Sequence, residues 1–137
     1  LSSEGKVLWE CESSDPHVGN TLFVFEAEMG GQSIIKVMFD SGASGNFISK
    51  SIVVDRLKLP RVKCPPVKVT VARNNNVKCD QQVNIPLRIR AYKARIPALV
   101  LPNDLDIDLI LGTAWQNTLH KGRITLCAED RTIDFEY

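Results

Sequence analysis

The feature that most constrains this chain is an apolar run that ends on a carboxylate and a tight turn. Residues 33–39 are mostly apolar and β-branched, which predicts a strand buried on both faces, and Asp40, Ser41 and Gly42 follow directly. Such a strand end fixes one acid beside a hydroxyl, where glycine lets the backbone turn sharply. Asp40 is therefore our candidate catalytic aspartate. Because all three are ordinary turn residues, the tripeptide alone favours a plain turn, and other parts of the chain must decide.

Length and charge limit both the number of domains and the kinds of partner. The chain has 137 residues, enough for one hydrophobic core, and its 17 Lys and Arg nearly balance 16 Asp and Glu. This balance leaves no large net field to attract nucleic acid or an anionic membrane. The basic residues also lack the aromatic neighbours of a base-stacking groove. We expect one soluble domain with no nucleic-acid or membrane partner, since no apolar run approaches the roughly 18 residues of a membrane span.

The cysteines and histidines form no recognisable metal site. No two cysteines have CxxC spacing, and neither histidine lies near a cysteine or carboxylate at helical ligand spacing. We therefore expect reduced thiols and no metal in a cytoplasmic protein, with a disulfide framework as the less favoured alternative. The start of the chain has no signal-peptide pattern. The residues concerned are Cys11, Cys64, Cys79, Cys127, His17 and His120.

Three acidic residues alternate before the apolar residues 109–111. Asp104, Asp106 and Asp108 resemble a carboxylate cluster or an oxygen-ligand site, but no glycine-bearing calcium-loop pattern surrounds them. We favour a solvated strand edge or loop. Two further roles stay open for Asp106 or Asp108, which are to help shape the cleft and to brace an arginine.

The order of turn and strand signals predicts a mostly β domain. Residues 1–20 are expected to be a loose lead-in with at most one short strand, followed by the folded domain at residues 21–137. Residues 21–28 and 33–39 form a hairpin around a glycine-rich turn. We predict further strands at residues 67–71, 83–89, 95–101, 109–111, 123–126 and 132–135, with a return strand from residue 77 and short helices at residues 49–57, capped by Ser49, and 114–119.

The prolines and the many short strands refine this prediction. Pro65 and Pro66 suggest a loop, whereas Pro86 and Pro97 suggest edge positions or strand ends. Many short strands with one or two short helices favour a closed barrel, with one lobe per chain.

The order and spacing of these parts resemble the retropepsins, the retroviral-type aspartic proteases, and among them those of Ty3/Gypsy-type LTR retrotransposons. The resemblance covers residues 21–137, nearly the whole chain. It rests on a strand that ends in the aspartate motif, a polar-tipped hairpin, and an apolar pair plus glycine at a helix start. The motifs are Phe39-Asp40-Ser41-Gly42-Ala43, Asn46-Phe47-Ile48-Ser49 and Ile110-Leu111-Gly112-Thr113-Ala114-Trp115.

The resemblance implies a role for each residue of the aspartate motif. Asp40 would be the catalytic aspartate, and the Ser41 hydroxyl would brace the two active-site loops across a dimer. Gly42 would let the loop approach its twin, and Ala43 would line the substrate cleft. The segment that would pack beneath the loop is Ile110, Leu111 and Gly112.

The resemblance also implies a flap, the hairpin at residues 69–77 that would close over a bound peptide. Family flaps usually have glycine near the tip, whereas this tip is polar and rich in asparagine. This difference keeps open a catalytically silent dimerisation or binding module. The flap residues are Arg73, Asn74, Asn75 and Asn76.

The chemistry requires two carboxylates, and the chain has one Asp-Ser-Gly motif. Peptide hydrolysis by aspartates needs one carboxylate to deprotonate water and one carboxylic acid to protonate the carbonyl oxygen. Like charges about 3 Å apart cannot both ionise, so one pair supplies acid and base together. We therefore expect a homodimer with Asp40 from each subunit on the two-fold axis, and no metal or organic cofactor.

The resulting expectation is an aspartic endopeptidase that cleaves a Gag/Gag-Pol-type polyprotein at sites flanked by hydrophobic residues. It would act in the cytoplasm, with virus-like particles as an alternative location. The first alternative is a cellular retropepsin-like protease of the ubiquitin-shuttle type that acts on host proteins. The second is the silent module.

Overall fold

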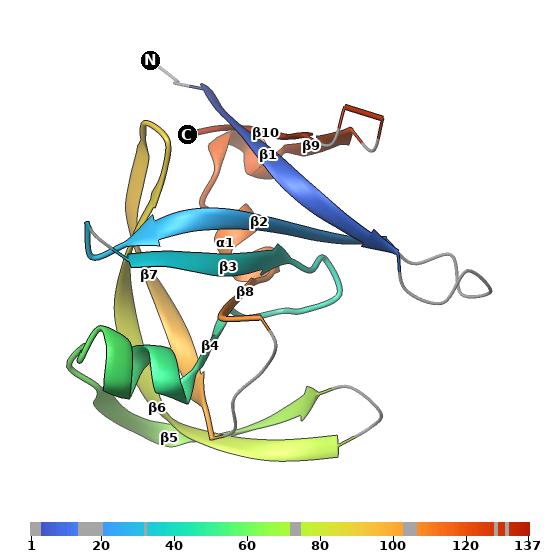
Figure 1. Ribbon diagram of the computed structural model, residues 1–137. Coiled ribbons are helices and arrows are strands. Elements are labelled where there is room, and N and C mark those ends of the chain that lie inside the picture. The colour runs from blue at the N-terminus through green and yellow to red at the C-terminus, as the bar shows by residue number, and fades with distance from the viewer. Residues whose placement is uncertain are drawn as a thin grey trace.

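A computed structural model describes residues 4–13, 21–31, 33–71, 75–102, 107–127, 129–130 and 132–137. Strands dominate it, and none of its described helices is long and apolar enough to cross a membrane (Figure 1). The strands are β1 (Glu4–Ser13), β2 (Thr21–Met29), β3 (Ser33–Phe39), β4 (Phe47–Ser49), β5 (Val62–Val71), β6 (Asn75–Ile89), β7 (Tyr92–Leu101), β8 (Leu109–Leu111), β9 (Ile124–Cys127) and β10 (Thr132–Glu136). The short helices are η1 (Ile52–Arg56), α1 (Thr113–Gln116) and η3 (His120–Gly122).

Six of the strands close into a barrel. The order is β6, β7, β4, β8, β3 and β2, and β2 pairs back onto β6 where Glu28 faces Arg88 and Met29 faces Leu87. Closure removes the sheet edges that an open sheet would expose. The predicted mostly β closed barrel with short helices and one lobe per chain is confirmed.

The β2–β3 hairpin has the predicted position. Its ladder runs from Phe23 opposite Phe39 to Met29 opposite Ser33. Gly30 and Gly31 form the turn with φ of 66° and 81°, backbone angles that residues with a Cβ rarely adopt. The turn therefore fixes the register between β2 and β3. This register places Phe39, the residue before Asp40, opposite Phe23.

The lead-in differs from the prediction of at most one short strand, which was wrong. β1 is ten residues long and pairs with two strands, with β10 from Glu4 to Leu8 and with β2 from Trp9 to Ser13. Its partner β10 lies at the other end of the sequence, so local polarity gave no sign of the pairing. The boundary between residues 20 and 21 stays a prediction.

The loop predicted at Pro65 and Pro66 is also wrong, because both lie within β5. The ladder between β5 and β6 shifts register between Lys63 and Val67, and β5 is an edge strand. A bulge on an edge strand is where proline, which has no N–H to donate, is tolerated. β6 is likewise one strand of 15 residues instead of two separate ones.

Pro86 and Pro97 lie inside long strands and not at their ends. Each pairs across the β6–β7 ladder, Pro86 with Arg95 and Pro97 with Asn84. On the other side, β2 pairs with β6 from Leu87, and β4 pairs with β7 from Leu99. The prediction of edge positions or strand ends was therefore wrong, because both prolines lie inside interior strands of the barrel. Each is tolerated there because it lies just outside the second ladder of its strand.

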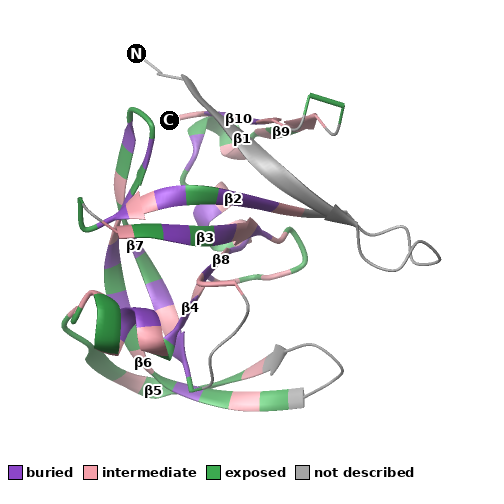
Figure 2. Cartoon of the chain, viewed as in Figure 1, coloured by how far each residue is buried: buried purple, intermediate pink, exposed green. Residues whose placement is uncertain are grey.

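The core is closed at one end by an aromatic cluster. Trp115 of α1 is fully buried, and its ring meets those of Phe39, Tyr92 and Phe135 edge-on at centroid distances of 5.4 to 6.4 Å. The Trp115 Nε1–H donates to the Tyr92 hydroxyl at 3.0 Å. Along the barrel strands, one face of each strand is directed at the core and the other at solvent. Figure 2 shows the resulting alternation of buried and exposed residues.

The buried Tyr92 hydroxyl yields a stability prediction. Tyr92→Phe leaves the Trp115 N–H without its acceptor, so the free energy of unfolding should fall by about 1–3 kcal/mol. Tyr137→Phe is the matched control, because Tyr137 is half-buried and packs on Tyr92. Urea denaturation followed by tryptophan fluorescence measures both. Equal losses in the two variants would contradict the importance of the hydrogen bond.

Candidate active site

Asp40 begins a tight turn that its own carboxylate helps to hold. Its backbone N–H donates to the Leu111 carbonyl at 2.9 Å, which joins the end of β3 to β8. The Gly42 N–H donates to Asp40 Oδ1 at 2.9 Å, and the Ala43 N–H donates to the Asp40 carbonyl at 3.1 Å. Asp40 is half-buried, whereas Ser41 and Gly42 are exposed. The turn therefore presents an oriented carboxylate at the surface.

The Asp40 carboxylate has no structural counter-ion in the described part of the chain. The ion pairs found there involve Arg56, Arg88 and His120, none of which reaches Asp40. A carboxylate placed by backbone hydrogen bonds and left without a cation is available for chemistry.

Strand β8 lies next to the Asp40 turn in the sheet. It lies between β3, to which it is parallel with Phe39 facing Leu111, and β4, to which it is antiparallel. All three residues of this strand are apolar, and Leu109 and Leu111 are fully buried. The structure thus places the segment that ends in Gly112 directly beside the Asp40 turn.

Gly112 allows the closest approach in the site. A Cβ built at this position would lie less than 3.0 Å from the carbonyl oxygens of Ala43 and Gly45. Backbone atoms cannot move aside as the end of a side chain can, so glycine is required by space. The next two amides hold the loop: the Thr113 N–H donates to the Ala43 carbonyl at 2.8 Å, and the Ala114 N–H donates to the Ser44 carbonyl at 3.1 Å.

Comparisons with known proteins agree with this geometry. Residues 25–115 match the Aspartyl protease family, and the matched stretch contains both the Asp40 turn and Gly112. The chain belongs to this family. No curated protein matches the sequence significantly.

Two solved structures share the fold of this aspartyl protease chain. One is a retropepsin-like aspartic protease from Rickettsia conorii, with 20% identity, a TM-score of 0.60, and coverage of 100% of this chain and 94% of the other. The second is the retroviral protease-like domain of Ddi1 from Leishmania major, with 15% identity, a TM-score of 0.55, and coverage of 79% and 82%. The fold is therefore retropepsin-like.

Asn46 holds the segments around Asp40 together, a role that sequence reasoning missed. Its side chain is buried, with Oδ1 accepting from the Gly112 N–H at 3.0 Å and Nδ2 donating to the Pro97 carbonyl at 3.1 Å. Its own carbonyl accepts from the Leu99 N–H at 2.9 Å. One amide thus joins the Asp40 loop, the helix start and β7. Its presence in the Asn-Phe-Ile-Ser motif was the only sequence signal.

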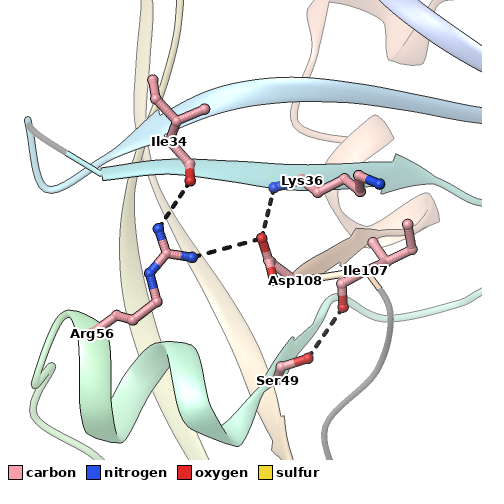
Figure 3. Close-up of polar contacts among 6 residues, drawn as sticks. All are labelled: Ile34, Lys36, Ser49, Arg56, Ile107 and Asp108. Atoms are coloured by element: carbon pink, nitrogen blue, oxygen red, sulfur yellow. Dashed lines mark hydrogen bonds and ion pairs between the residues drawn. The ribbon is translucent and has the colours of Figure 1, made fainter.

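A second polar network fixes the other end of β8 (Figure 3). Asp108 Oδ2 accepts from the Lys36 N–H at 2.8 Å and lies 3.9 Å from Arg56 Nη1, while Arg56 Nη2 donates to the Ile34 carbonyl at 3.0 Å. The proposed role of Asp108, bracing an arginine, is therefore seen. Asp104 and Asp106 lie outside the described residues.

Ser49 belongs to the same network and is not a helix cap. Its Oγ donates to the Ile107 carbonyl at 3.1 Å, and Ser51 takes the position before η1 without a capping hydrogen bond from its side chain. The prediction of a Ser49 cap was wrong. β4 extends through Ser49, and the Ser49 hydroxyl is directed at Ile107 in the segment before β8.

The predicted flap corresponds to the hairpin of β5 and β6. Arg73 and Asn74 lie outside the described residues, whereas Asn75 and Asn76 begin β6 opposite Val71 and Thr70. The hairpin has the predicted position, and closure over a peptide stays a prediction.

The remaining candidates for chemistry are weaker. Among the described residues, no three His, Cys, Asp or Glu gather into a metal site. Cys64, Cys79 and Cys127 are free thiols. Burial raises the pKa of Cys79, with Cys64 and Asp80 nearby adding to the effect, so this thiol is protonated at neutral pH. His120 is an exposed residue 3.8 Å from Glu136.

The contact at Gly112 predicts a large effect of one methyl group. Gly112→Ala should lower the free energy of unfolding by about 1–3 kcal/mol, because the added Cβ pushes against backbone carbonyls. In the control Gly45→Ala, the nearest atom to the added Cβ is 3.3 Å away in the Phe47 ring, which can rotate. Chemical denaturation compares the two. A Gly112→Ala protein as stable as Gly45→Ala would contradict the spatial requirement.

The Asn46 hydrogen bonds predict local loosening of the loop. Asn46→Leu leaves the buried Gly112 N–H and Pro97 carbonyl without partners, at a cost of about 1–3 kcal/mol each. Hydrogen exchange measured by NMR should become faster at the Gly112 amide. The Leu87 amide, which lies in β6 where Leu87 pairs with Ala94 of β7, provides the internal reference. Unchanged protection at Gly112 would show that the amide does not hold the loop.

Proposed function

We propose that this chain is an aspartic endopeptidase that acts as a homodimer. The observation that supports this most directly is the Asp40 turn, which presents one oriented, half-buried carboxylate without a counter-ion among the described residues. Membership of the aspartyl protease family supports the same activity. Because each chain contributes one such turn, two chains would complete the carboxylate pair.

The mechanism follows from two Asp40 side chains that share one proton. The ionised carboxylate takes a proton from water as the water oxygen attacks the peptide carbonyl carbon, and the protonated partner gives its proton to the carbonyl oxygen. When the tetrahedral intermediate collapses, the carbon–nitrogen bond breaks and the amine leaves with a proton. In this proposal Ser41 braces the paired loops, Gly42 permits their approach and Ala43 lines the cleft.

The terminal strands constrain where the dimer would form. β1, β9 and β10 pair with one another within one chain, so they complete its own sheet. The exposed Ser41 and Gly42 then become the natural centre of the contact between subunits. The flap hairpin of each subunit would close over the cleft.

For the substrate, we propose a Gag/Gag-Pol-type polyprotein cleaved at sites flanked by hydrophobic residues, as in the Ty3/Gypsy-type proteases that the motifs resemble. Processing would take place in the cytoplasm or within virus-like particles. The alternative of a cellular retropepsin-like protease is supported by the sources of the similar structures, Rickettsia conorii and Leishmania major. A cleavage-site profile separates the two, because cuts confined to the domain junctions of a precursor favour the retroelement.

Substitution of the aspartate tests the activity. Asp40→Asn should lower peptide cleavage by at least about 100-fold, because the amide can neither accept the water proton nor share one with its twin. A peptide library at mildly acidic pH, with and without pepstatin, is the assay, and Asp55→Asn on exposed η1 is the control. Equal cleavage by Asp40→Asn would refute the role of Asp40. If the wild type forms a dimer and cleaves nothing, the silent module is correct.

Sedimentation across concentration tests the shared site. We expect a reversible equilibrium between monomer and dimer, with specific activity that rises as the dimer forms. A tandem single-chain dimer with Asp40→Asn in one copy should lose activity nearly as fully as one with both copies changed. A strict monomer that still cleaves peptides would refute the pairing of two Asp40 residues.

A further inference from the structure

The outer face of the β6–β7 hairpin bears a row of positive charge. In the ladder, Arg88 faces Lys93 and Pro86 faces Arg95, so these side chains project from one face, opposite to the buried Leu87. Arg88, Lys93 and Arg95 are all exposed. We call these three residues the cationic face. Its charge is local, because the whole chain has a net charge of only +1.

The cationic face surrounds a hollow. Its three side chains, together with Gly30 and Gly31 of the β2–β3 turn, line a cavity of about 470 Å³. The two glycines have no side chains, which leaves the space in front of the hairpin open. A cation-lined concavity raises the local concentration of anionic groups more than a flat surface does.

A second, apolar hollow adjoins the first. Arg95 lines both, and the second cavity, of about 290 Å³, is also lined by Leu59, Val62 and Pro97. Val62 is 59% exposed, which makes it one of the most exposed large apolar side chains described. Exposed apolar side chains at a concave site are typical of a binding surface.

Little of the charge on the cationic face is neutralised within the chain. Glu28 pairs with Arg88 at 3.0 Å. In the described part of the chain, no carboxylate forms an ion pair with Lys93 or Arg95. Among the described residues, these two cations beside an apolar hollow therefore have no ion-pair partner that would explain them as part of the fold.

We propose that the cationic face and the adjoining apolar hollow bind an extended acidic peptide segment of a partner polypeptide. Lys93 and Pro97 lie four residues apart on β7, or about 13 Å along a strand. The segment would therefore place acidic residues over the cationic face and a leucine or isoleucine about four residues further on, in the apolar hollow. This site is new relative to the proposed catalytic function and does not depend on it.

The surface fits a peptide better than a nucleic acid. The described residues that line the two hollows include no aromatic side chain on which a base could stack. The apolar hollow, in contrast, matches an aliphatic side chain.

The site lies away from Asp40. β3 starts at Ser33, just after the Gly30–Gly31 turn, and its seven residues end at Phe39, directly before Asp40, so about 20 Å separates the two along the strand. Figure 1 shows the turn and the loop after β3 at opposite ends of this strand. A segment docked at the cationic face would therefore leave Asp40 accessible. A peptide could bind at both places at once.

Fluorescence anisotropy with a labelled peptide tests the proposal. The probe contains three consecutive glutamates and a leucine four residues on, and the protein is Asp40→Asn, so that the probe stays intact. At physiological salt, where screening acts over about 8 Å, we expect saturable binding. Lys93→Glu combined with Arg95→Glu should weaken it at least about tenfold, because charges that contact the ligand are reversed.

The matched control reverses the same amount of charge elsewhere. Lys68 and Lys78 also face each other across a ladder and are exposed, but they line neither hollow. Lys68→Glu with Lys78→Glu should change the affinity less than about threefold, as screened charges do. Val62→Ser should weaken the leucine probe and leave a serine version of the probe unchanged.

Four outcomes would overturn the proposal. They are absence of saturable binding, equal losses in the two charge-reversal proteins, tighter binding of an oligonucleotide of equal charge, and displacement of the probe by pepstatin. The last would place the peptide at the Asp40 site. Because binding is measured in a protein without its catalytic carboxylate, failure here leaves the proposed protease function untouched, and the reverse also holds.

Discussion

The close contact between Gly112 and the loop after β3 is the constraint on which the rest of the site depends. The loop carbonyls of Ala43 and Ser44 accept the amides of Thr113 and Ala114, so the start of α1 satisfies polar groups that the loop would otherwise leave unpaired. A side chain at position 112 would separate the two segments. The position of Asp40 therefore depends on a residue without a Cβ atom, Gly112, about seventy residues downstream.

Around this contact, the barrel supports β8 at both ends. Asn46 ties one end of the strand to β7, and the Asp108 network ties the other end to β3 and η1. A strand of three residues forms few ladder hydrogen bonds, whereas β6 forms many because it has 15 residues. β8 is therefore held in place by side-chain hydrogen bonds as well. The position of β8 beside the Asp40 turn is thus held by residues outside that turn.

Sequence reasoning found the parts of the site that are local and missed those that depend on distant contacts. The Asp40 turn and Gly112 could be predicted, because a strand that ends in Asp-Ser-Gly and an apolar pair that ends in glycine are short patterns. The role of Asn46 could not, since its partners include Pro97, which is 51 residues away. The length of β1 and the strand character of Pro65 and Pro66 were missed for the same reason: pairing partners, not local propensity, decide them.

The pairing of β1 with β10 has a consequence for the timing of folding. It joins residues 4–8 to residues 132–136, close to the two ends of the described chain. Contacts so distant in sequence form late and slow a folding reaction. During synthesis, the barrel strands that hold Asp40 would all emerge from the ribosome before the partner of β1 does. This part of the sheet can be completed only after residue 136 has left the exit tunnel, so β1 has to wait for its partner while the barrel strands are already available to pair.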